Sequence, residues 1–162
     1  MRMAETTHLK DLKPNPQNAR MRTERSASLI ERSIERYGCA RSIVIDEDGT
    51  ILCGHGTVEA AASLGIERVK IVEGDGNTLI AVRRKGLDET QKAGLAIADN
   101  RASDLSEFNV NALLSLPKAA LDISFSDSEL EGLKSLAERG DESEKAPLTC
   151  PSCGYVFGST TR

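Results

Sequence analysis

The sequence predicts an α+β fold, and three observations lead to it: short apolar stretches typical of strands, helices opened by capping boxes, and a glycine-rich strand-to-helix junction. Residues 42–46 and 50–53 flank a tight turn and predict a β-hairpin. The second strand runs into Gly54-His55-Gly56-Thr57, and an Ala-rich helix follows up to Gly65. Two glycines there let the backbone approach a ligand, and the helix start favours an anion. A tight turn that binds nothing is the competing interpretation.

The N-terminal third contains one predicted strand and one predicted helix. Residues 8–20 predict an extended segment, an edge strand followed by a loop, because Pro14 and Pro16 lack backbone N–H donors. Ser28 and Glu31 have the spacing of a capping box, which predicts a helix from this point. Gly38 supplies the stop signal of that helix.

The segment after the Ala-rich helix alternates strand and helix signals. Residues 69–72 predict a strand, and residues 78–82 are a further β-prone stretch that is also compatible with the start of a helix. Asp88 and Gln91 form a second capping box, which opens a helix through about Asp104. Its predicted inward residues are Ala93, Ile97 and Ala98.

The last third is predicted to be helical before it becomes a linker. Residues 110–116 predict a short helical turn, and Ser126 with Glu129 forms a third capping box. Leu130, Leu133 and Leu136 are the predicted buried stripe of the helix that follows. The stretch from Ala137 to Pro147 has no pattern of a buried face, which predicts a linker.

At 162 residues the chain predicts one domain with a small appendage. We expect a core over residues 1–86, a helical extension of the same domain over 87–136, a linker over 137–147 and a separate tail over 148–162. The longest apolar runs are far too short to span a bilayer, and the N-terminus lacks the apolar stretch of a signal peptide. These observations predict a cytoplasmic protein without membrane partners.

The charge distribution limits the contacts that we expect with nucleic acids. The formal net charge of −4 argues against strong sequence-independent DNA binding by the whole surface. Aromatic residues make up 3% of the chain, which argues against a broad stacking platform for single-stranded bases. Positive charge is nevertheless enriched over residues 2–41, with nine Lys and Arg against five acidic residues, and again at residues 83–85. Either region is a candidate for contact with phosphates, or simply a solvated face.

The order of the motifs resembles the ParB/sulfiredoxin-like domain in the form found in phage and mobile-element proteins. The resemblance rests on four sequence features: Leu-x-x-Leu-x-Pro-Asn-Pro-x-Asn-x-Arg over residues 9–20, a helix ending in Tyr37-Gly38, the Gly54-His55-Gly56 turn, and residues 97–108 with Asn100-Arg101. The resemblance covers about residues 8–136. It implies a small mixed sheet with flanking helices and a pocket for nucleotide phosphate, with CTP or ATP and Mg²⁺ as the candidate ligands.

The resemblance also carries over a set of site residues. Asn18 and Arg20 match the polar loop after the first strand, and Asn100 and Arg101 match an Asn-Arg pair near the phosphates. The phosphate-cradling Gly-x-x-Arg turn of the family corresponds to Gly54, His55, Gly56 and Thr57. Thr57 stands where the family has arginine, so one neutral hydroxyl replaces a positively charged guanidinium with several N–H donors. We expect Arg20 or Arg101 to compensate, or phosphate chemistry to have been lost.

His55 and the cysteines add candidate chemistry. A histidine between two glycines has a pKa suited to a general base, which makes His55 the candidate catalytic residue, although it can equally serve as a structural hydrogen-bonding group. Cys150-Pro-Ser-Cys153-Gly has the form of a zinc knuckle. It supplies two of the four ligands that a structural zinc ion needs. Three possibilities follow: the tail of a second subunit completes the site in a homodimer, the tail is a truncated zinc ribbon, or the tail binds no metal. Cys39 and Cys53 are predicted to be small buried hydrophobic residues.

The sequence therefore predicts a nucleotide-phosphate-binding domain that acts in DNA transactions, such as DNA binding, partition or modification, of a phage or mobile element. The implied partners are DNA and a DNA methyltransferase or another phage enzyme. Two alternatives remain open: a metal-dependent nuclease or nucleotide hydrolase, and a non-catalytic adaptor that dimerises through the zinc tail.

Overall fold

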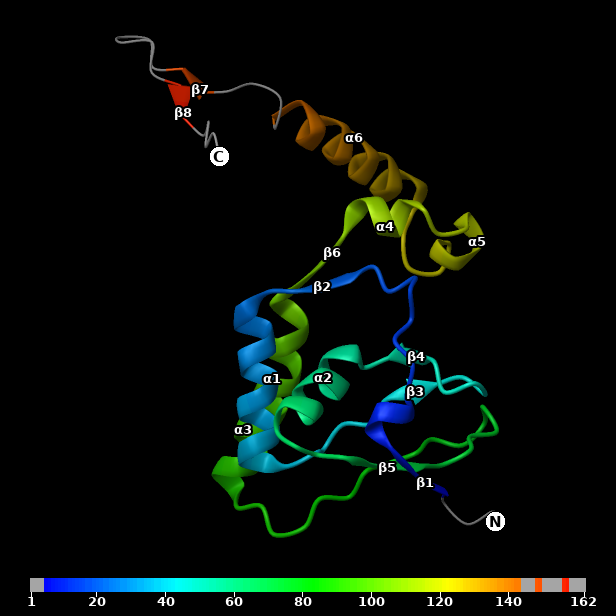
Figure 1. Cartoon of the computed structure of the whole chain (residues 1–162), viewed down its shortest axis with the longest axis vertical. Helices are drawn as coiled ribbons and strands as arrows, with labels where there is room; N and C mark the ends of the chain where they lie inside the picture. The colour runs from blue at the N-terminus through cyan, green and yellow to red at the C-terminus, as the bar shows by residue number, and fades with distance from the viewer. Residues whose placement is uncertain (1–4, 144–147, 150–155, 158–162) are drawn as a thin grey trace. The chain divides into compact units, whose positions relative to one another are not determined.

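The computed structural model describes residues 5–143, 148–149 and 156–157, and it confirms the α+β class (Figure 1). The chain divides into two compact units after Phe108. In chain order the first unit contains β1 (Glu5–His8), a 3-10 helix (Leu9–Asp11), β2 (Arg20–Arg22), α1 (Glu24–Tyr37), β3 (Val44–Ile45), β4 (Ile51–Cys53), α2 (His55–Ser63), β5 (Arg68–Ile71), α3 (Glu89–Asp104) and β6 (Ser106–Phe108). The second contains α4 (Val110–Leu114), α5 (Lys118–Leu121), α6 (Asp127–Ser143), β7 (Leu148–Thr149) and β8 (Val156–Phe157).

The strands of the first unit pair two by two in antiparallel ladders: β1 with β5, β2 with β6, and β3 with β4. The β3–β4 pair is the predicted hairpin. The Asp46 carboxylate closes its turn by accepting from the amides of Asp48 at 3.0 Å and Thr50 at 2.7 Å, and these bonds lower the pKa of Asp46.

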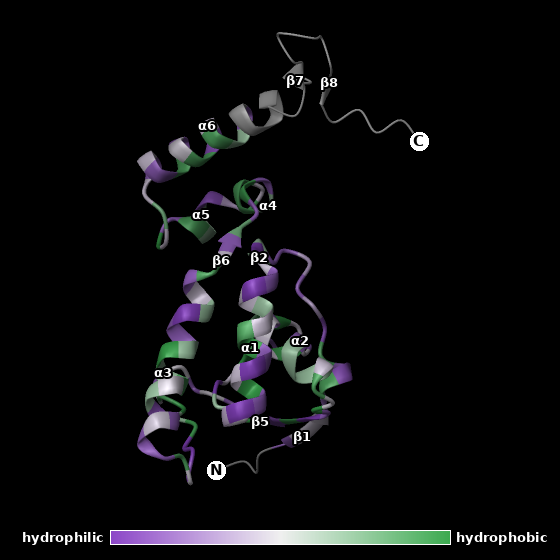
Figure 2. Ribbon diagram, turned by 90° about the vertical axis from the view of Figure 1, so that its left-hand side faces the viewer, coloured by the Kyte–Doolittle hydropathy of each residue, from purple (hydrophilic) through white to green (hydrophobic). Residues whose placement is uncertain are grey.

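Three helices form the centre of the first unit, with α1 between α2 and α3 (Figure 2). Ile34 of α1, Ile51 of β4, and Ala60 and Ala61 of α2 are buried there. The two alanines allow α2 to pack closely on α1, because they place only a methyl group between the helices.

Helix α1 begins earlier than the capping box at Ser28 predicted. Its N-cap is Thr23, whose hydroxyl accepts from the Ser26 amide at 3.1 Å, so Ser28 and Glu31 lie inside the helix. The predicted stop is confirmed: Gly38 has a φ of 74°, and its amide donates to the Ile34 carbonyl at 2.7 Å.

Helix α3 has the predicted boundaries but not the predicted inner face. The Asp88 side chain accepts from the Gln91 amide at 2.8 Å and the Gln91 side chain accepts from the Asp88 amide at 3.0 Å, which confirms the capping box. Ala93 is exposed and Ile97 is 68% exposed, so their inward placement was wrong. At Gly94 a Cβ atom would collide with the Tyr37 hydroxyl of α1, so a glycine permits the close approach of these helices.

Two predicted strands end or fail for local reasons. The edge strand expected at the start of residues 8–20 lies earlier, over Glu5–His8. It ends at His8 because the next residues turn into a 3-10 helix, whose Asp11 carboxylate accepts from the His8 amide at 3.3 Å. Residues 78–82 form no strand, and Leu79 is 93% exposed. A β-prone composition is therefore not sufficient for a strand, because strand formation depends on pairing and packing more than on intrinsic preference.

The second unit packs α4 against α6 around Leu113, Leu121 and Leu130. The third capping box is confirmed, because the Ser126 amide donates to the Glu129 carboxylate at 2.7 Å. The buried stripe is shorter than predicted, since Leu136 is 57% exposed. The linker expected from Ala137 was also wrong over its first half, because α6 continues to Ser143.

Candidate functional site

The predicted anion-binding turn lies at the start of α2, and the helix begins earlier than expected. Gly54 is the N-cap with a φ of 95°, and its carbonyl accepts from the amides of Thr57 at 2.9 Å and Val58 at 3.1 Å. His55, Gly56 and Thr57 therefore form the first helical turn. A Cβ atom at position 54 would lie 2.6 Å from Ile43 Cγ2, so both the backbone conformation and the available space require glycine there.

The amides of His55 and Gly56 have no hydrogen-bond acceptor among the residues that the structure describes. They are the first two donors of a nine-residue helix, where the helix dipole also has its positive end. Both effects favour a negatively charged oxygen at this position.

Arg22 lies directly beside this turn, although no sequence motif singles it out. A Cβ atom at Gly56 would lie 2.8 Å from Arg22 Nη1 and 3.0 Å from Arg22 Cδ. The guanidinium forms an ion pair with Glu59 of α2, and the two side chains are 21% and 63% exposed. The only sequence signal was the alternation Arg20-Met21-Arg22, which does not say which arginine reaches which helix.

His55 joins the N-terminal loop to the turn. Its Nε2 atom accepts from the Asn15 amide at 3.2 Å, so this nitrogen carries no proton and the neutral ring has its proton on Nδ1. Burial lowers the pKa of His55, the nearby Arg22 charge lowers it further, and Glu59 opposes the shift. A neutral imidazole at physiological pH is compatible with a base, but its Nε2 lone pair already has a donor. The catalytic role of His55 stays a prediction.

Asn18 and Arg20 lie at a different place, the C-terminal end of α3. Arg20 Nη2 donates to the Ser103 carbonyl at 2.8 Å, and its Nε donates to the Ser106 hydroxyl at 2.9 Å. Its guanidinium also lies 5.1 Å from the centre of the Phe108 ring. The Asn18 side chain accepts from the Arg20 amide at 3.1 Å. Arg20 therefore satisfies the end of a helix.

Asn100 and Arg101 are exposed on α3. Arg101 pairs with Asp104 at 3.6 Å on the same helix. In the described part of the chain, no hydrogen bond or ion pair connects Asn100 or Arg101 with the Gly54–Thr57 turn. The phosphate-binding role of these two residues stays a prediction.

The cysteines divide into two that can be located and two that cannot. Cys39 and Cys53 are exposed, contrary to the expectation that they are buried. The zinc-knuckle prediction falls on Cys150 and Cys153, which lie outside the described residues. Within the described ranges, no three His, Cys, Asp or Glu side chains gather in a way that could hold a metal ion.

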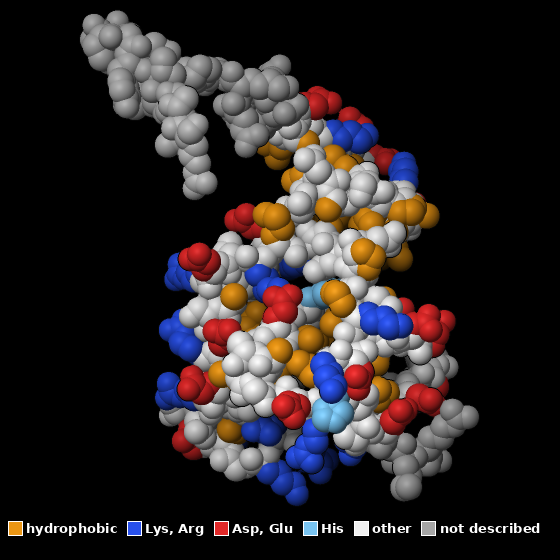
Figure 3. All heavy atoms as spheres, in the orientation of Figure 1, with side chains coloured by type: hydrophobic (Ala, Val, Ile, Leu, Met, Phe, Trp, Pro, Cys, Tyr) orange, Lys and Arg blue, Asp and Glu red, His pale blue; other side chains and the backbone are white. Residues whose placement is uncertain are grey.

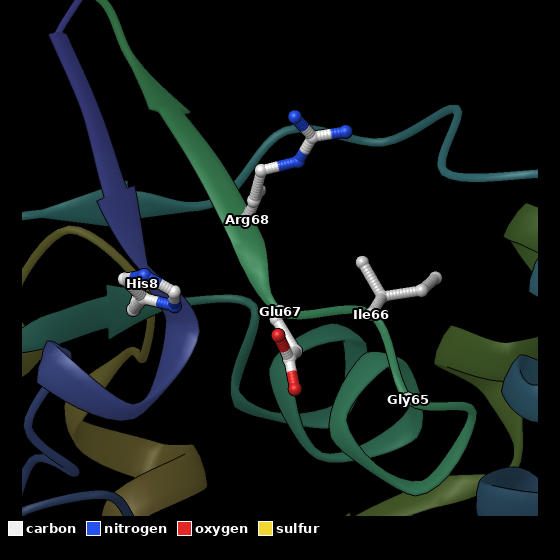
Figure 4. A pocket seen from close by; sticks show the side chains of 5 residues that line it. All are labelled: His8, Gly65, Ile66, Glu67 and Arg68. Carbon is white, nitrogen blue, oxygen red and sulfur yellow. The ribbon is translucent and has the colours of Figure 1, made fainter.

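A pocket of about 470 Å³ lies near the other end of α2, lined by His8, Gly65, Ile66, Glu67 and Arg68 (Figure 4). The Arg68 side chain points away from that of Glu67 in this view. No predicted site residue lines the pocket. Acidic and basic side chains are interspersed over the visible face of the first unit (Figure 3), and no described helix has the length and apolar character needed to cross a membrane.

The comparison with known proteins shows the family to which the chain belongs. Over 65 residues, or 40% of its length, the chain is 42% identical to the ParB-like nuclease domain-containing protein YnaK of Escherichia coli (strain K12), and the match covers 74% of YnaK. At this identity and coverage, the chain belongs to the family of ParB-like domain proteins. No family model matches the chain, and no solved structure matches it.

Proposed function

We propose that this chain is a nucleotide-phosphate-binding ParB-like domain that acts in DNA transactions. The observation that carries the proposal is the pair of acceptor-free amides of His55 and Gly56 at the start of α2. A phosphate oxygen accepts from both amides without any rearrangement of the helix, and the helix dipole adds to the attraction. Gly54, His55, Gly56 and Thr57 would form the cradle, with Asn18, Arg20, Asn100 and Arg101 as the further residues of the proposed set.

The proposed ligand is CTP or ATP with Mg²⁺, because a triphosphate offers the highest density of anionic oxygens to a short turn. The proposed macromolecular partner is DNA, and two observations favour it: membership of the ParB-like family and the positive charge enriched over residues 2–41. We further propose that the chain acts in a phage or mobile element, with a DNA methyltransferase or another phage enzyme as its partner.

Isothermal titration of the full chain with CTP, ATP and GTP in the presence of Mg²⁺ tests the nucleotide proposal. We expect saturable heat for at least one nucleotide with the wild-type chain and none with Thr57→Glu. A carboxylate in the first turn is compatible with the helix but repels phosphate. Thr90→Glu places the same change in the first turn of α3 and should leave binding intact. Heat from no nucleotide, or equal heat from the wild type and Thr57→Glu, would contradict the proposal.

A metal-dependent nuclease is the second candidate, and the similarity to YnaK, a ParB-like nuclease domain-containing protein, favours it. It predicts Mg²⁺- or Mn²⁺-dependent cleavage of plasmid DNA that disappears in His55→Ala. Cleavage that persists in His55→Ala would remove that residue from the reaction. Absence of cleavage with either metal would remove this candidate altogether.

We also propose that the tail binds Zn²⁺ through Cys150 and Cys153, with two subunits completing the site in a homodimer. This arrangement is that of the adaptor alternative and predicts about half a zinc ion per chain. It also predicts a dimer that dissociates with a chelator or in Cys150→Ser. Metal analysis that finds less than about a tenth of a zinc ion per chain would dismiss it.

A further inference from the structure

The turn at the start of α2 has no positive side chain of its own. Gly54, Gly56 and Thr57 are uncharged, and the His55 ring is neutral while its Nε2 accepts from Asn15. The amides alone offer partial charges, and a triphosphate is ordinarily bound with at least one full positive charge. The side chain that can supply this charge must therefore come from another element.

We propose that Arg22 of β2 is the phosphate-binding cation of this site and that Glu59 of α2 holds its guanidinium until phosphate displaces the carboxylate. The inference rests on the proposed function. Arg22 thus takes the role that the family turn gives to an arginine at position 57, where this chain has threonine.

The packing around Gly56 keeps the guanidinium next to the turn. The missing side chain at position 56 leaves the space that Arg22 occupies, since a Cβ atom there would lie 2.8 Å from Arg22 Nη1 and 3.0 Å from Ile30 Cδ1. Arg22 is only 21% exposed, so most of its length is held by neighbouring atoms. A cation held in this way loses little conformational entropy when it binds a ligand.

Glu59 forms only a weak ion pair with Arg22, so a phosphate can displace it. Glu59 is 63% exposed, and an ion pair with one solvated member contributes little to stability. Glu59 is also the only described partner to which Arg22 donates. A guanidinium has five N–H donors, so Arg22 can donate to a phosphate oxygen in place of the carboxylate, or in addition to it.

The other two arginines proposed for the site are engaged elsewhere. Arg20 donates to the Ser103 carbonyl and the Ser106 hydroxyl, and both hydrogen bonds would be lost if it moved to the turn. Arg101 pairs with Asp104 within its own helix. Among the three, the geometry places only Arg22 beside the acceptor-free amides.

The experiment measures the affinity of the full chain for CTP, ATP and inorganic tripolyphosphate by isothermal titration, with single and double variants. Arg22→Gln should weaken binding about tenfold or more, which corresponds to one lost charge-assisted hydrogen bond, and Arg22→Lys should recover part of the loss. Glu59→Gln should strengthen binding several-fold, because it removes the competing anion. In the double variant the gain from Glu59→Gln should vanish, since no guanidinium remains to be released.

Two exposed residues of α1 provide controls that match each charge change, Arg25→Gln and Glu35→Gln. Both should bind like the wild type, and thermal melting of every variant verifies that it is folded. Should Arg22→Gln fail to fold, Glu59→Gln still decides the matter, because that side chain is largely exposed. Wild-type binding with unchanged affinity in Arg22→Gln and Glu59→Gln would overturn this inference alone. Lack of wild-type binding to all three probes would overturn the proposed function and this inference with it.

Discussion

Two polar junctions of the first unit differ in how completely the protein satisfies them. At the C-terminal end of α3, side chains from β2, from α1 and from the N-cap of α1 donate to backbone carbonyls: Ser26 donates to Ala102 at 3.0 Å, Arg20 to Ser103 at 2.8 Å and Thr23 to Leu105 at 2.9 Å. At the start of α2, the first two amides have no acceptor among the described residues. We call the first the closed junction, because the chain's own side chains donate to its carbonyls. We call the second the open junction, because two of its amides have no described acceptor.

This difference separates two arginines that the sequence presents as equivalent. Arg20 and Arg22 are two positions apart on one short strand, where alternate side chains share a face. Arg20 nevertheless reaches the end of α3, while Arg22 reaches the start of α2. The first guanidinium offsets the negative end of a helix dipole, so it stabilises the fold. The second lies beside a positive end, an arrangement that an anion would stabilise.

The largest effect is expected at the open junction, from its backbone. Gly54→Ala should lower the free energy of unfolding by about 3 kcal/mol, because it combines left-handed strain with a collision against Ile43. Gly65→Ala has a similar φ of 73° with open space around it, so it should lose only about 1 kcal/mol. Urea unfolding of the two variants measures the difference. Equal losses would show that the Ile43 contact does not constrain the turn.

A smaller loss is expected at the closed junction. Ser26 is fully buried, and Ser26→Ala removes the hydroxyl that satisfies the Ala102 carbonyl. The free energy of unfolding should fall by about 1–3 kcal/mol, while the affinity for nucleotide stays unchanged. Ser28→Ala on the exposed side of α1 should change stability by less than about 0.5 kcal/mol. A loss of nucleotide affinity in folded Ser26→Ala would mean that the two junctions are coupled.

The pH dependence of the free energy of unfolding tests the role of His55 at the open junction. Its pKa is lowered in the folded chain, so the folded state favours the neutral ring. The resulting stability is fully present above the unfolded pKa of about 6.5 and is lost as the pH falls below it. His55→Gln keeps an acceptor near Asn15 but does not titrate there. Urea midpoints should therefore fall more between pH 7.5 and pH 5.5 in the wild type than in His55→Gln, and parallel falls would refute this role.

The smallest effect is expected away from both junctions. Arg41 and Asp99 form an ion pair at 3.2 Å between side chains that are 57% and 48% exposed. Arg41→Gln should lower the free energy of unfolding by less than about 1 kcal/mol, and 1 M salt should remove most of that difference. A larger or salt-insensitive loss in urea unfolding would indicate that exposed ion pairs matter as much here as the buried Ser26 hydroxyl.

The sequence by itself determined the features that depend on a few neighbouring residues. The hairpin closed by Asp46, the capping box at Asp88, the stop at Gly38 and the glycine at the start of α2 all follow from local backbone chemistry. Only the tertiary structure decided the rest. Thr23, not Ser28, caps α1, and its hydroxyl also donates to the distant Leu105 carbonyl. Residues 78–82 form no strand in spite of their β-prone composition. Arg22 reaches the open turn because Gly56 leaves room for it. These contacts depend on which helix end lies within reach of a long side chain. That distance is set by how elements far apart in the sequence pack, so local sequence does not determine it.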